Sequence, residues 1–387
     1  MKKLPCGLQV FEKLINENCV YVDKTKYFID LIENGWLYFL SRPRRFGKTL
    51  AIYTFKALFE GEKELFKGLY AEEWINRPEF EPCPVIHLDM SKVVTNKGLE
   101  VLEDSIGRIV IKIAEELNVE VDKNITAGEI FSDLIVKLSR KNNKKVVILV
   151  DEYDKPLTDF LQSDEDTIKN LKDILRNFYI HIKANEQYTK FVFITGIAKF
   201  TKVGIFSTLN NLTDISFDKE CGAICGYTEE EIIKYFPDYL ELTAKNLQLT
   251  TAELIYKMRN YYDGFCFDGE TKLYNPYSTL LFLREKDFSN YWIDTGTSKY
   301  IADYLKNKNL TVEQFHNLPI SRGFARTPGE IDTATPESFL YQSGYLTLRP
   351  GITSDFVLDY PNTEVLNSMS ELLTKNMMQY VVIRKKN

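Results

Sequence analysis

The sequence predicts an α/β protein with a doubly wound parallel sheet, followed by a mainly helical region and a winged-helix-like module. Short apolar runs alternate with segments of helical periodicity up to about residue 220. The run V-V-I-L-V-D ending at Asp151 has no apolar-polar alternation, so both faces of its strand should be covered, as in parallel sheets. Helical patterns dominate after this part. We therefore expect a core over 1–220, a helical region over 221–335 and a C-terminal module over 336–387.

The expected core elements follow one another along the chain. A short helix and the Tyr21–Thr25 turn lead to the first strand. The expected strands are Trp36–Leu40, Pro84–Met90, the run from Val146, Phe191–Gly196 and Asp214–Phe217. One expected helix follows the first strand and ends near Gly61. The others cover Leu99–Leu117, Ala127–Leu138 and Asp164–Ala184. This alternation favours right-handed crossovers and a layer of helices on each face.

The C-terminal half has different signals. Thr228 before an acidic turn predicts a capped helix reaching Phe236. Two D-G turns between aromatic residues predict a hairpin over 261–276. The expected module consists of a helix Glu337–Ser343, strands Tyr345–Arg349 and Asp355–Asp359, and a helix after Pro361.

One motif lies between the first strand and an amphipathic helix. Gly47-Lys48-Thr49 has the G-K-[ST] form in which backbone N–H groups and the lysine hold phosphates and the hydroxyl ligates Mg²⁺. The complete P-loop pattern begins with glycine, whereas this chain has Arg42 followed by Pro43. A chance triplet therefore stays open as an alternative at this point.

A second motif decides between these alternatives. Asp151-Glu152 ends the most strand-like run of the chain. In P-loop ATPases, an aspartate at such a strand end holds the Mg²⁺ shell, and an adjacent glutamate activates the attacking water. The pair after a G-K-T strand-loop-helix predicts a P-loop NTPase core with Walker A and Walker B motifs.

The predicted roles follow from these two motifs. Lys48 is assigned to the β- and γ-phosphates, Thr49 and Asp151 to Mg²⁺, and Glu152 to the water. Thr195 ends the next strand and is predicted to sense the γ-phosphate, the alternative being a threonine that only ends a strand. The residues expected to surround ATP are Arg44, Arg45, Phe46, Gly47, Lys48, Thr49 and Leu50.

Several charged residues near these motifs have two interpretations. Arg44 and Arg45 could contact phosphates or be solvated at the sheet edge. Lys199 and Lys202 could read phosphate charge or cap a surface. No arginine finger in cis is evident from the sequence, so we expect slow turnover until a partner or a second subunit completes the site.

Composition limits the class of protein. The chain has 387 residues, 44% of them hydrophobic and 27% charged, which is typical of soluble globular proteins. Its formal net charge of -6 gives no global basic field for nucleic acid. No membrane span or signal peptide is expected, so we predict a cytoplasmic protein. The six cysteines lack metal-binding spacing, which favours reduced thiols over a zinc site.

Longer motifs resemble one protein family. They are S-R-P-R-R-F-G-K-T, V-I-L-V-D-E-Y-D-K-P, T-G-I-A-K-F-T-K-V-G-I-F-S-T-L-N-N-L, Y-D-G-F-C-F and Y-W-I-D-T-G-T. Together they resemble the bacterial AAA-ATPase-like family over nearly the whole chain. In that family the loop begins with R-P-R-R-F, so the resemblance implies that Arg42 is the family form. It also implies a core of the additional-strand, catalytic-glutamate type.

Members of the family commonly continue into a PD-(D/E)XK nuclease domain. We expect no nuclease in this chain, because too little length follows the winged-helix-like module. The string Asp263…Glu270-Thr271-Lys272 lies in the expected hairpin, where a nuclease fold has no room for its strands.

The sequence therefore predicts a Mg²⁺-dependent ATPase whose nucleotide state moves its C-terminal region. The alternatives are a nucleotide-binding switch or scaffold with negligible hydrolysis, and a small-molecule kinase. The expected ligands are ATP, ADP and Mg²⁺. A DNA or nuclease partner and a homo-oligomer stay open, and the suspected nucleic-acid segment runs from Asn362 to Lys375.

Overall fold

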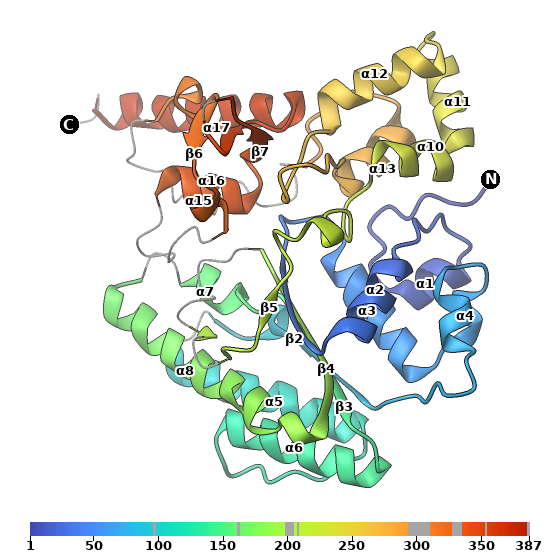
Figure 1. Cartoon of the computed structure of the whole chain (residues 1–387). Coiled ribbons are helices and arrows are strands. Elements are labelled where there is room, and N and C mark those ends of the chain that lie inside the picture. Colours follow the sequence, from blue (N-terminus) through green and yellow to red (C-terminus); the bar gives the residue numbers. More distant parts are fainter. Residues whose placement is uncertain are drawn as a thin grey trace.

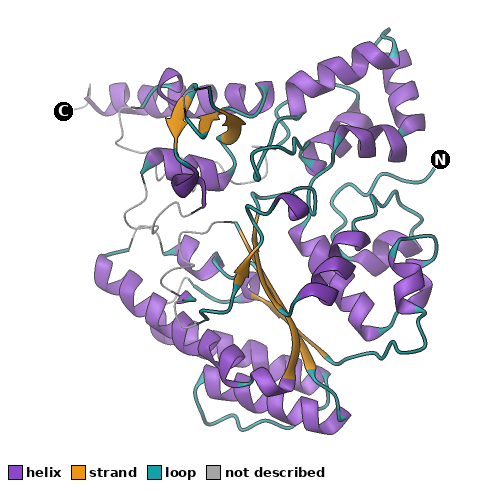
Figure 2. Ribbon diagram, viewed as in Figure 1, coloured by secondary structure: helices purple, strands orange, loops and turns teal. Residues whose placement is uncertain are grey.

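The chain is built around a five-stranded parallel sheet (Figures 1 and 2). The computed structural model describes residues 1–95, 98–160, 163–197, 205–206, 209–292, 310–326, 335–352 and 354–384. The strands are β1 Leu37–Ser41, β2 Val85–Asp89, β3 Val146–Asp151, β4 Thr189–Gly196 and β5 Thr213–Asp214. Their order is β2-β3-β4-β1-β5. Strand β4 thus separates the two motif-bearing strands, β1 and β3, as expected of an additional-strand P-loop core.

Helices cover both faces of this sheet, which confirms the predicted fold class. In the order of the chain they are α1 Phe11–Asn16, α2 Thr25–Asn34, α3 Lys48–Glu60, α4 Ala71–Ile75, α5 Leu99–Glu116, α6 Ala127–Asn142, α7 Lys155–Asp159 and α8 Glu165–Ala184. Figure 1 shows α5, α6 and α8 together on one side of the sheet and α1 to α4 on the other. Most core boundaries agree with the sequence within a few residues, but the fifth strand is confined to Thr213–Asp214.

The alternating side chains of the strands supply two hydrophobic cores. The closed core lies under α5, α6 and α8, and its members all fall within residues 37–209. They include Phe39, Ile86, Ile148, Val150, Val192, Ile194, Ile106, Phe131, Leu134, Leu175 and Phe178. The shared core joins the other face of the sheet to the C-terminal half. Its members include Leu40, Phe55, Leu149, Phe193, Phe46, Phe265, Trp292, Phe339, Tyr345, Leu358 and Met369.

The region after the core is mainly helical, as predicted. Its helices are α10 Glu229–Tyr235, α11 Pro237–Asn246, α12 Thr251–Tyr262 and α13 Pro276–Glu285. The predicted cap is present, because Thr228 and Glu231 form a reciprocal capping box at the start of α10. The expected hairpin is reduced to a loop in which Phe265 and Leu273 form an isolated antiparallel bridge.

The C-terminal module contains the predicted order of helix, two strands and helix. These elements are α16 Pro336–Ser343, β7 Thr347–Pro350, β8 Phe356–Asp359 and α17 Thr363–Arg384. The antiparallel sheet also takes β6, Leu318–Ile320, which pairs with β8 and is followed by α15, Arg322–Arg326. This sheet therefore begins before the expected boundary at residue 336. Strand β6 was not expected, because Pro319 argues against a strand except at the edge of a sheet, where β6 lies.

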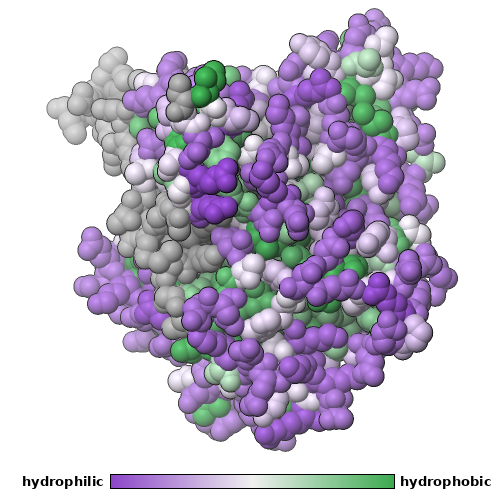
Figure 3. Space-filling view, viewed as in Figure 1, coloured by the Kyte–Doolittle hydropathy of each residue, from purple (hydrophilic) through white to green (hydrophobic). Residues whose placement is uncertain are grey.

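Both C-terminal parts lie over the same end of the parallel sheet (Figure 1). Hydrophilic side chains cover most of the face seen in Figure 3, and apolar residues show in patches between them. Across the described residues, no helix has the length and apolarity that crossing a membrane requires.

Candidate nucleotide site

The loop between β1 and α3 lies at the carboxyl end of the sheet. Gly47 has a φ of 96° and Arg45 a φ of 69°, both in the left-handed region. Glycine adopts this conformation without steric cost, and the bend at Gly47 starts α3 at Lys48. The free N–H groups in the first turn of α3 consequently face the space in front of the loop, which is the arrangement that binds anions.

Arg42 explains how the loop forms without its first glycine. Its side chain is 1% exposed, and its guanidinium donates to the carbonyl oxygens of Ser41 at 3.0 Å, Ser216 at 2.8 Å and Cys221 at 3.2 Å. It also lies 4.5 Å from the ring centroid of Phe267. The arginine therefore ties the end of β1 to the segment that follows β5, which no local sequence pattern indicates.

The C-terminal half holds the middle of the loop. The ring of Phe46 makes edge-to-face contacts with Phe265 and Phe267, at centroid distances of 4.9 and 5.3 Å. The indole Nε1 of Trp292 donates to the carbonyl oxygen of Arg44 at 3.2 Å. The backbone of this loop is thus positioned by residues more than 200 positions further along the chain.

The ammonium of Lys48 lies against its own loop. It donates to the carbonyl oxygens of Arg42 at 2.8 Å and Pro43 at 3.0 Å. Burial lowers the pKa of Lys48, while the carboxylates of Glu152 and Asp151 oppose that shift. Lys48 therefore bonds to its own loop and not to Asp151. A bound triphosphate would give the Lys48 ammonium charged oxygens in place of the carbonyl oxygens of Arg42 and Pro43.

Asp151 lies at the end of β3 and is held by the neighbouring strand. Its Oδ1 accepts hydrogen bonds from the Thr195 hydroxyl at 2.7 Å and from the backbone N–H of Glu152 at 3.1 Å. Among the residues that the structure describes, both bonds end on Oδ1, so Oδ2 is the oxygen available to a metal ion. Thr195 is fully buried, and its hydroxyl is directed to Asp151.

Glu152 has an unusual backbone. Its φ of 53° lies in the left-handed region, which is uncommon for residues other than glycine and is concentrated at functional sites. Burial raises the pKa of Glu152, and the Lys48 ammonium only partly offsets this effect. A carboxyl with a raised pKa can accept a proton from water more readily than an exposed glutamate.

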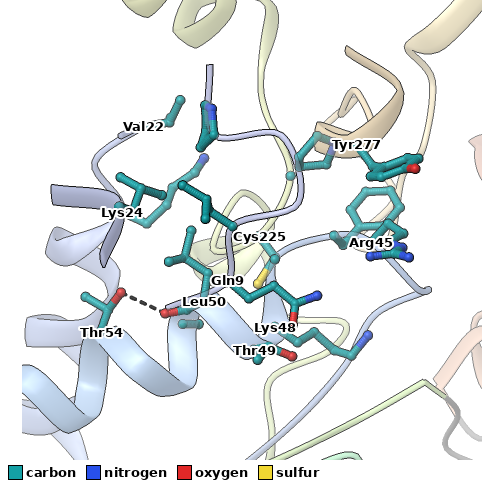
Figure 4. A pocket seen from close by; sticks show the side chains of 18 of the residues that line it. Gln9, Val22, Lys24, Arg45, Lys48, Thr49, Leu50, Thr54, Cys225 and Tyr277 are labelled. Carbon is teal, nitrogen blue, oxygen red and sulfur yellow. Dashed lines mark hydrogen bonds between the residues drawn. The ribbon is translucent and has the colours of Figure 1, made fainter. Parts of the chain in front are cut away.

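A cavity of about 400 Å³ brings the loop and Glu152 together, a volume in the range of small-molecule sites. It is lined by every residue of the predicted loop set, namely Arg44, Arg45, Phe46, Gly47, Lys48, Thr49 and Leu50. Figure 4 shows Lys48, Thr49 and Leu50 on one side and Arg45 beside Tyr277 on another. The described lining does not include Asp151 or Thr195.

The N-terminal leader and the helical region close the rest of this cavity, which the sequence did not indicate. Gln9, Val22 and Lys24 enter from the leader, and Cys225 and Tyr277 from the opposite side (Figure 4). The guanidinium of Arg45 lies 4.8 Å from the Tyr277 ring centroid. The buried Lys24 pairs with the half-buried Glu231 of α10 at 2.6 Å, and burial lowers the pKa of Lys24. Lys155 also lines the cavity, next to Glu152.

Other residues singled out in the sequence lie elsewhere. Lys199 and Lys202 fall outside the described residues. Glu270 is exposed and pairs with Lys219, and Thr271 bonds to Asp268. The described part of the chain contains no cluster of three or more histidine, cysteine, aspartate or glutamate residues placed to hold a metal ion.

Comparison with known proteins adds the family. Residues 5–206 match the family described as "Predicted AAA-ATPase". The chain belongs to this family. A relative described as "Uncharacterized protein in vnfD 5'region", from Azotobacter chroococcum mcd 1, is 34% identical over 380 residues, or 96% of this chain and 70% of the relative. Membership of the predicted AAA-ATPase family supports nucleotide binding and ATPase activity at a general level.

Two solved structures show weaker similarity. Cdc6p from Pyrobaculum aerophilum aligns with a TM-score of 0.34 and 11% identity, covering 93% of each chain. The Aeropyrum pernix ORC2 protein aligns with a TM-score of 0.35 and 12% identity, also covering 93% of each chain. TM-scores of this size support no conclusion about this chain.

Proposed function

We propose that this chain binds ATP with Mg²⁺, hydrolyses it, and couples its nucleotide state to the C-terminal region. The observation that carries the proposal is the cavity in which the first turn of α3 and Lys48 face Glu152. Phosphoryl transfer depends mostly on positioning and on stabilising the charge of the transferring group, and these groups are of the required types.

The residues have separate roles in this proposal. Lys48 and the N–H groups of the loop would hold the β- and γ-phosphates, with Arg44 and Arg45 at the edge. The Thr49 hydroxyl and Asp151 Oδ2 are hard oxygen donors, which fit Mg²⁺, and the bound ion would neutralise charge on the phosphates. Glu152 would accept a proton from the attacking water.

Thr195 contacts the carboxylate of Asp151 in the neighbouring strand. Its hydroxyl donates to Asp151 at 2.7 Å and lies 3.3 Å from the carbonyl oxygen of Val150. We assign it to positioning the Asp151 carboxylate, which would leave Oδ2 available to hold Mg²⁺. This role resembles the hydrogen bonds that orient metal ligands in other proteins.

Contacts with the loop support the coupling. Trp292 donates through Nε1 to the Arg44 carbonyl, and its backbone N–H donates to Glu364 at 2.9 Å. Glu364 is buried in the first turn of α17 and also accepts from Ser278 of α13 at 3.0 Å. A shift of the loop on binding phosphate would therefore displace a residue that bonds directly to α17.

Phosphate release tests the catalytic part. We expect the wild-type chain to release phosphate from ATP with Mg²⁺ and to stop when EDTA removes the metal. Glu152→Gln should lower kcat by about 100-fold or more while retaining ATP binding, because general bases contribute about 10²–10⁴-fold. Glu165→Gln, an exposed carboxylate at the start of α8, is the matched control and should turn over normally.

Other outcomes would decide against hydrolysis. If the wild type and Glu152→Gln both bind ATP and neither releases phosphate, the chain is a nucleotide-binding switch. Formation of ADP without free phosphate would instead indicate a kinase.

The charge on the surface of α17 indicates which kind of partner this helix could contact. The exposed residues within 363–374 are Asn367, Glu371 and Thr374, none of which is positively charged. Nucleic-acid backbones are bound mainly through Lys and Arg. We therefore propose that α17 acts on a protein, such as a nucleic-acid-processing partner. Glu371→Arg adds positive charge to this helix. Salt-sensitive DNA binding by the full chain that tightens in this variant would place DNA on the helix, and binding that is unchanged would place it elsewhere.

A further inference from the structure

The turn after β3 presents two side chains to the cavity and anchors two others. Tyr153 is buried in the closed core, with its ring 5.3 Å from that of Phe39 and 5.1 Å from that of Phe206. Asp154 is also buried, and its Oδ2 accepts from the backbone N–H of Ile197 at 2.9 Å. These two anchors fix the turn from both sides.

The residues on either side of the anchors face the cavity. Glu152 and Lys155 both line it, and the backbone N–H of Lys155 donates to the carbonyl oxygen of Glu152 at 2.9 Å. The turn therefore places Glu152 and Lys155 in the lining of the cavity that contains Lys48. The contacts of Tyr153 and Asp154 do not involve the side chains of Glu152 or Lys155. The conformation of the turn therefore does not depend on the charges of those two side chains.

The ammonium of Lys155 has a partner that it can leave. It pairs with Asp159, one helical turn further along α7. Asp159 also accepts from the Thr95 hydroxyl at 2.7 Å, so this carboxylate keeps a hydrogen bond when the lysine moves. Both side chains of the pair are about one-third exposed, and an ion pair of this kind is weak compared with contact to a phosphate.

We propose that Lys155 is a catalytic residue that contacts the transferring phosphoryl group from within the same chain. The inference rests on the proposed ATPase function. It gives Lys155 the role for which no arginine finger in cis is evident from the sequence. On nucleotide binding, the ammonium leaves Asp159 and donates to an oxygen of the γ-phosphate. Lys48 holds the phosphates from the loop side, and Lys155 holds them from the side of Glu152.

The chemical step balances without a bond to Lys155. The oxygen of water bonds to the γ-phosphorus, and the bond between that phosphorus and the β,γ-bridging oxygen breaks. Its electron pair stays on ADP, and one proton of the water passes to Glu152. Lys155 stabilises charge on the equatorial oxygens during this exchange and returns to Asp159 when phosphate leaves.

Three variants of the full chain test the assignment. Lys155→Gln removes the charge, Lys155→Arg keeps it, and Asp159→Asn removes the resting partner but leaves the lysine. We expect Lys155→Gln to lower kcat by about 10- to 100-fold, since cationic groups at a transferring phosphoryl are worth factors of this size or larger. The affinity for ADP should change less than about threefold, because ADP lacks the γ-phosphate that the lysine contacts.

The other two variants separate catalysis from structure. Lys155→Arg should restore at least about a third of the wild-type turnover, and Asp159→Asn should match or exceed the wild type, because its lysine is released. Equal losses in Lys155→Gln and Asp159→Asn would show that the ion pair only supports α7 and would overturn the inference. Melting temperatures of all variants, measured in the same buffer, show whether each one is folded.

The control for the underlying function is the wild type itself. If it releases phosphate and Lys155→Gln does so equally fast, the inference about Lys155 fails and the ATPase proposal stands. If the wild type releases none while binding ATP, the ATPase proposal fails and the catalytic role of Lys155 fails with it.

Discussion

The two faces of the parallel sheet differ in how far their hydrophobic cores extend. The closed core is completed by α5, α6 and α8, whose sequences follow or precede the strands directly. The shared core contains strand residues such as Leu149 and Phe193, and it continues through Phe46 and Phe265 to Met369 of α17. The phosphate-binding loop therefore belongs to the core that joins the two halves of the chain.

This difference separates stability from coupling. A change in the closed core should weaken folding and leave the communication between loop and C-terminal region intact. A change in the shared core should affect both the stability and the coupling, because the residues that position the loop also contact the C-terminal region. Pro43 illustrates the closeness of the two parts, since a Cβ at Gly344 would lie 2.6 Å from its side chain.

Matched phenylalanine substitutions should show the largest effect. Phe46 and Phe131 are both buried, the first against Phe265 and Phe267 and the second stacked on Phe178. We expect either change to alanine to cost about 3–5 kcal/mol in the free energy of unfolding, measured by denaturant titration. Phe46→Leu and Phe131→Leu, which should cost less than about 1.5 kcal/mol, are the variants for binding assays.

Of the two variants, only Phe46→Leu should weaken ATP binding, because Phe46 belongs to the loop and Phe131 does not contact it. Equal ATP affinity in the two leucine variants would contradict the distinction between the cores.

Restoring the missing glycine gives the next largest effect. Arg42→Gly completes the G-x-x-x-x-G-K-T pattern, yet we expect it to destabilise the chain by about 2–3 kcal/mol. The reason is that the buried carbonyl oxygens of Ser216 and Cys221 lose a charged donor. ATP affinity should fall as well. A variant that binds ATP more tightly than the wild type would mean that the loop does not need its arginine.

Acidification should have a smaller, graded effect. Burial raises the pKa of Glu152, so its proton-accepting form is lost at a higher pH than for an exposed glutamate. As the pH falls through this raised pKa, kcat/KM should drop about tenfold per unit. The limb should be absent from the residual activity of Glu152→Gln. A limb that persists in this variant would assign the proton acceptor to another group.

Local patterns were enough for the regular parts of the fold. The apolar run of β3 and the Thr228 cap are properties of neighbouring residues, and they predicted β3 and the start of α10 correctly. The G-K-T and D-E motifs also pointed to one end of one sheet, because the carboxyl ends of parallel strands share an edge.

Long-range contacts account for what the sequence did not indicate. Apart from its neighbour Ser41, the carbonyl partners of Arg42 come from positions 174 to 180 residues away. Strand β6 pairs with β8 across 35 or more intervening residues. The sequence did not single out Lys155, which is one residue of the D-E-Y-D-K-P motif. Its place in the cavity lining depends on tertiary contacts of Tyr153 and Asp154, which fix the turn. Such contacts leave no periodicity in the chain.

The most direct test of the coupling uses Trp292 as a reporter. The chain has three tryptophans, and Trp36→Phe with Trp74→Phe leaves Trp292 as the only tryptophan, which is excited selectively over the tyrosines. Its indole touches the loop through Arg44, and its backbone touches α17 through Glu364. We predict that ATP with Mg²⁺ changes the Trp292 emission, that ADP gives a different spectrum, and that Lys48→Ala in the same background shows neither change. Identical spectra with ATP, with ADP and without nucleotide, while calorimetry shows that both nucleotides bind, would contradict the coupling of loop and C-terminal region.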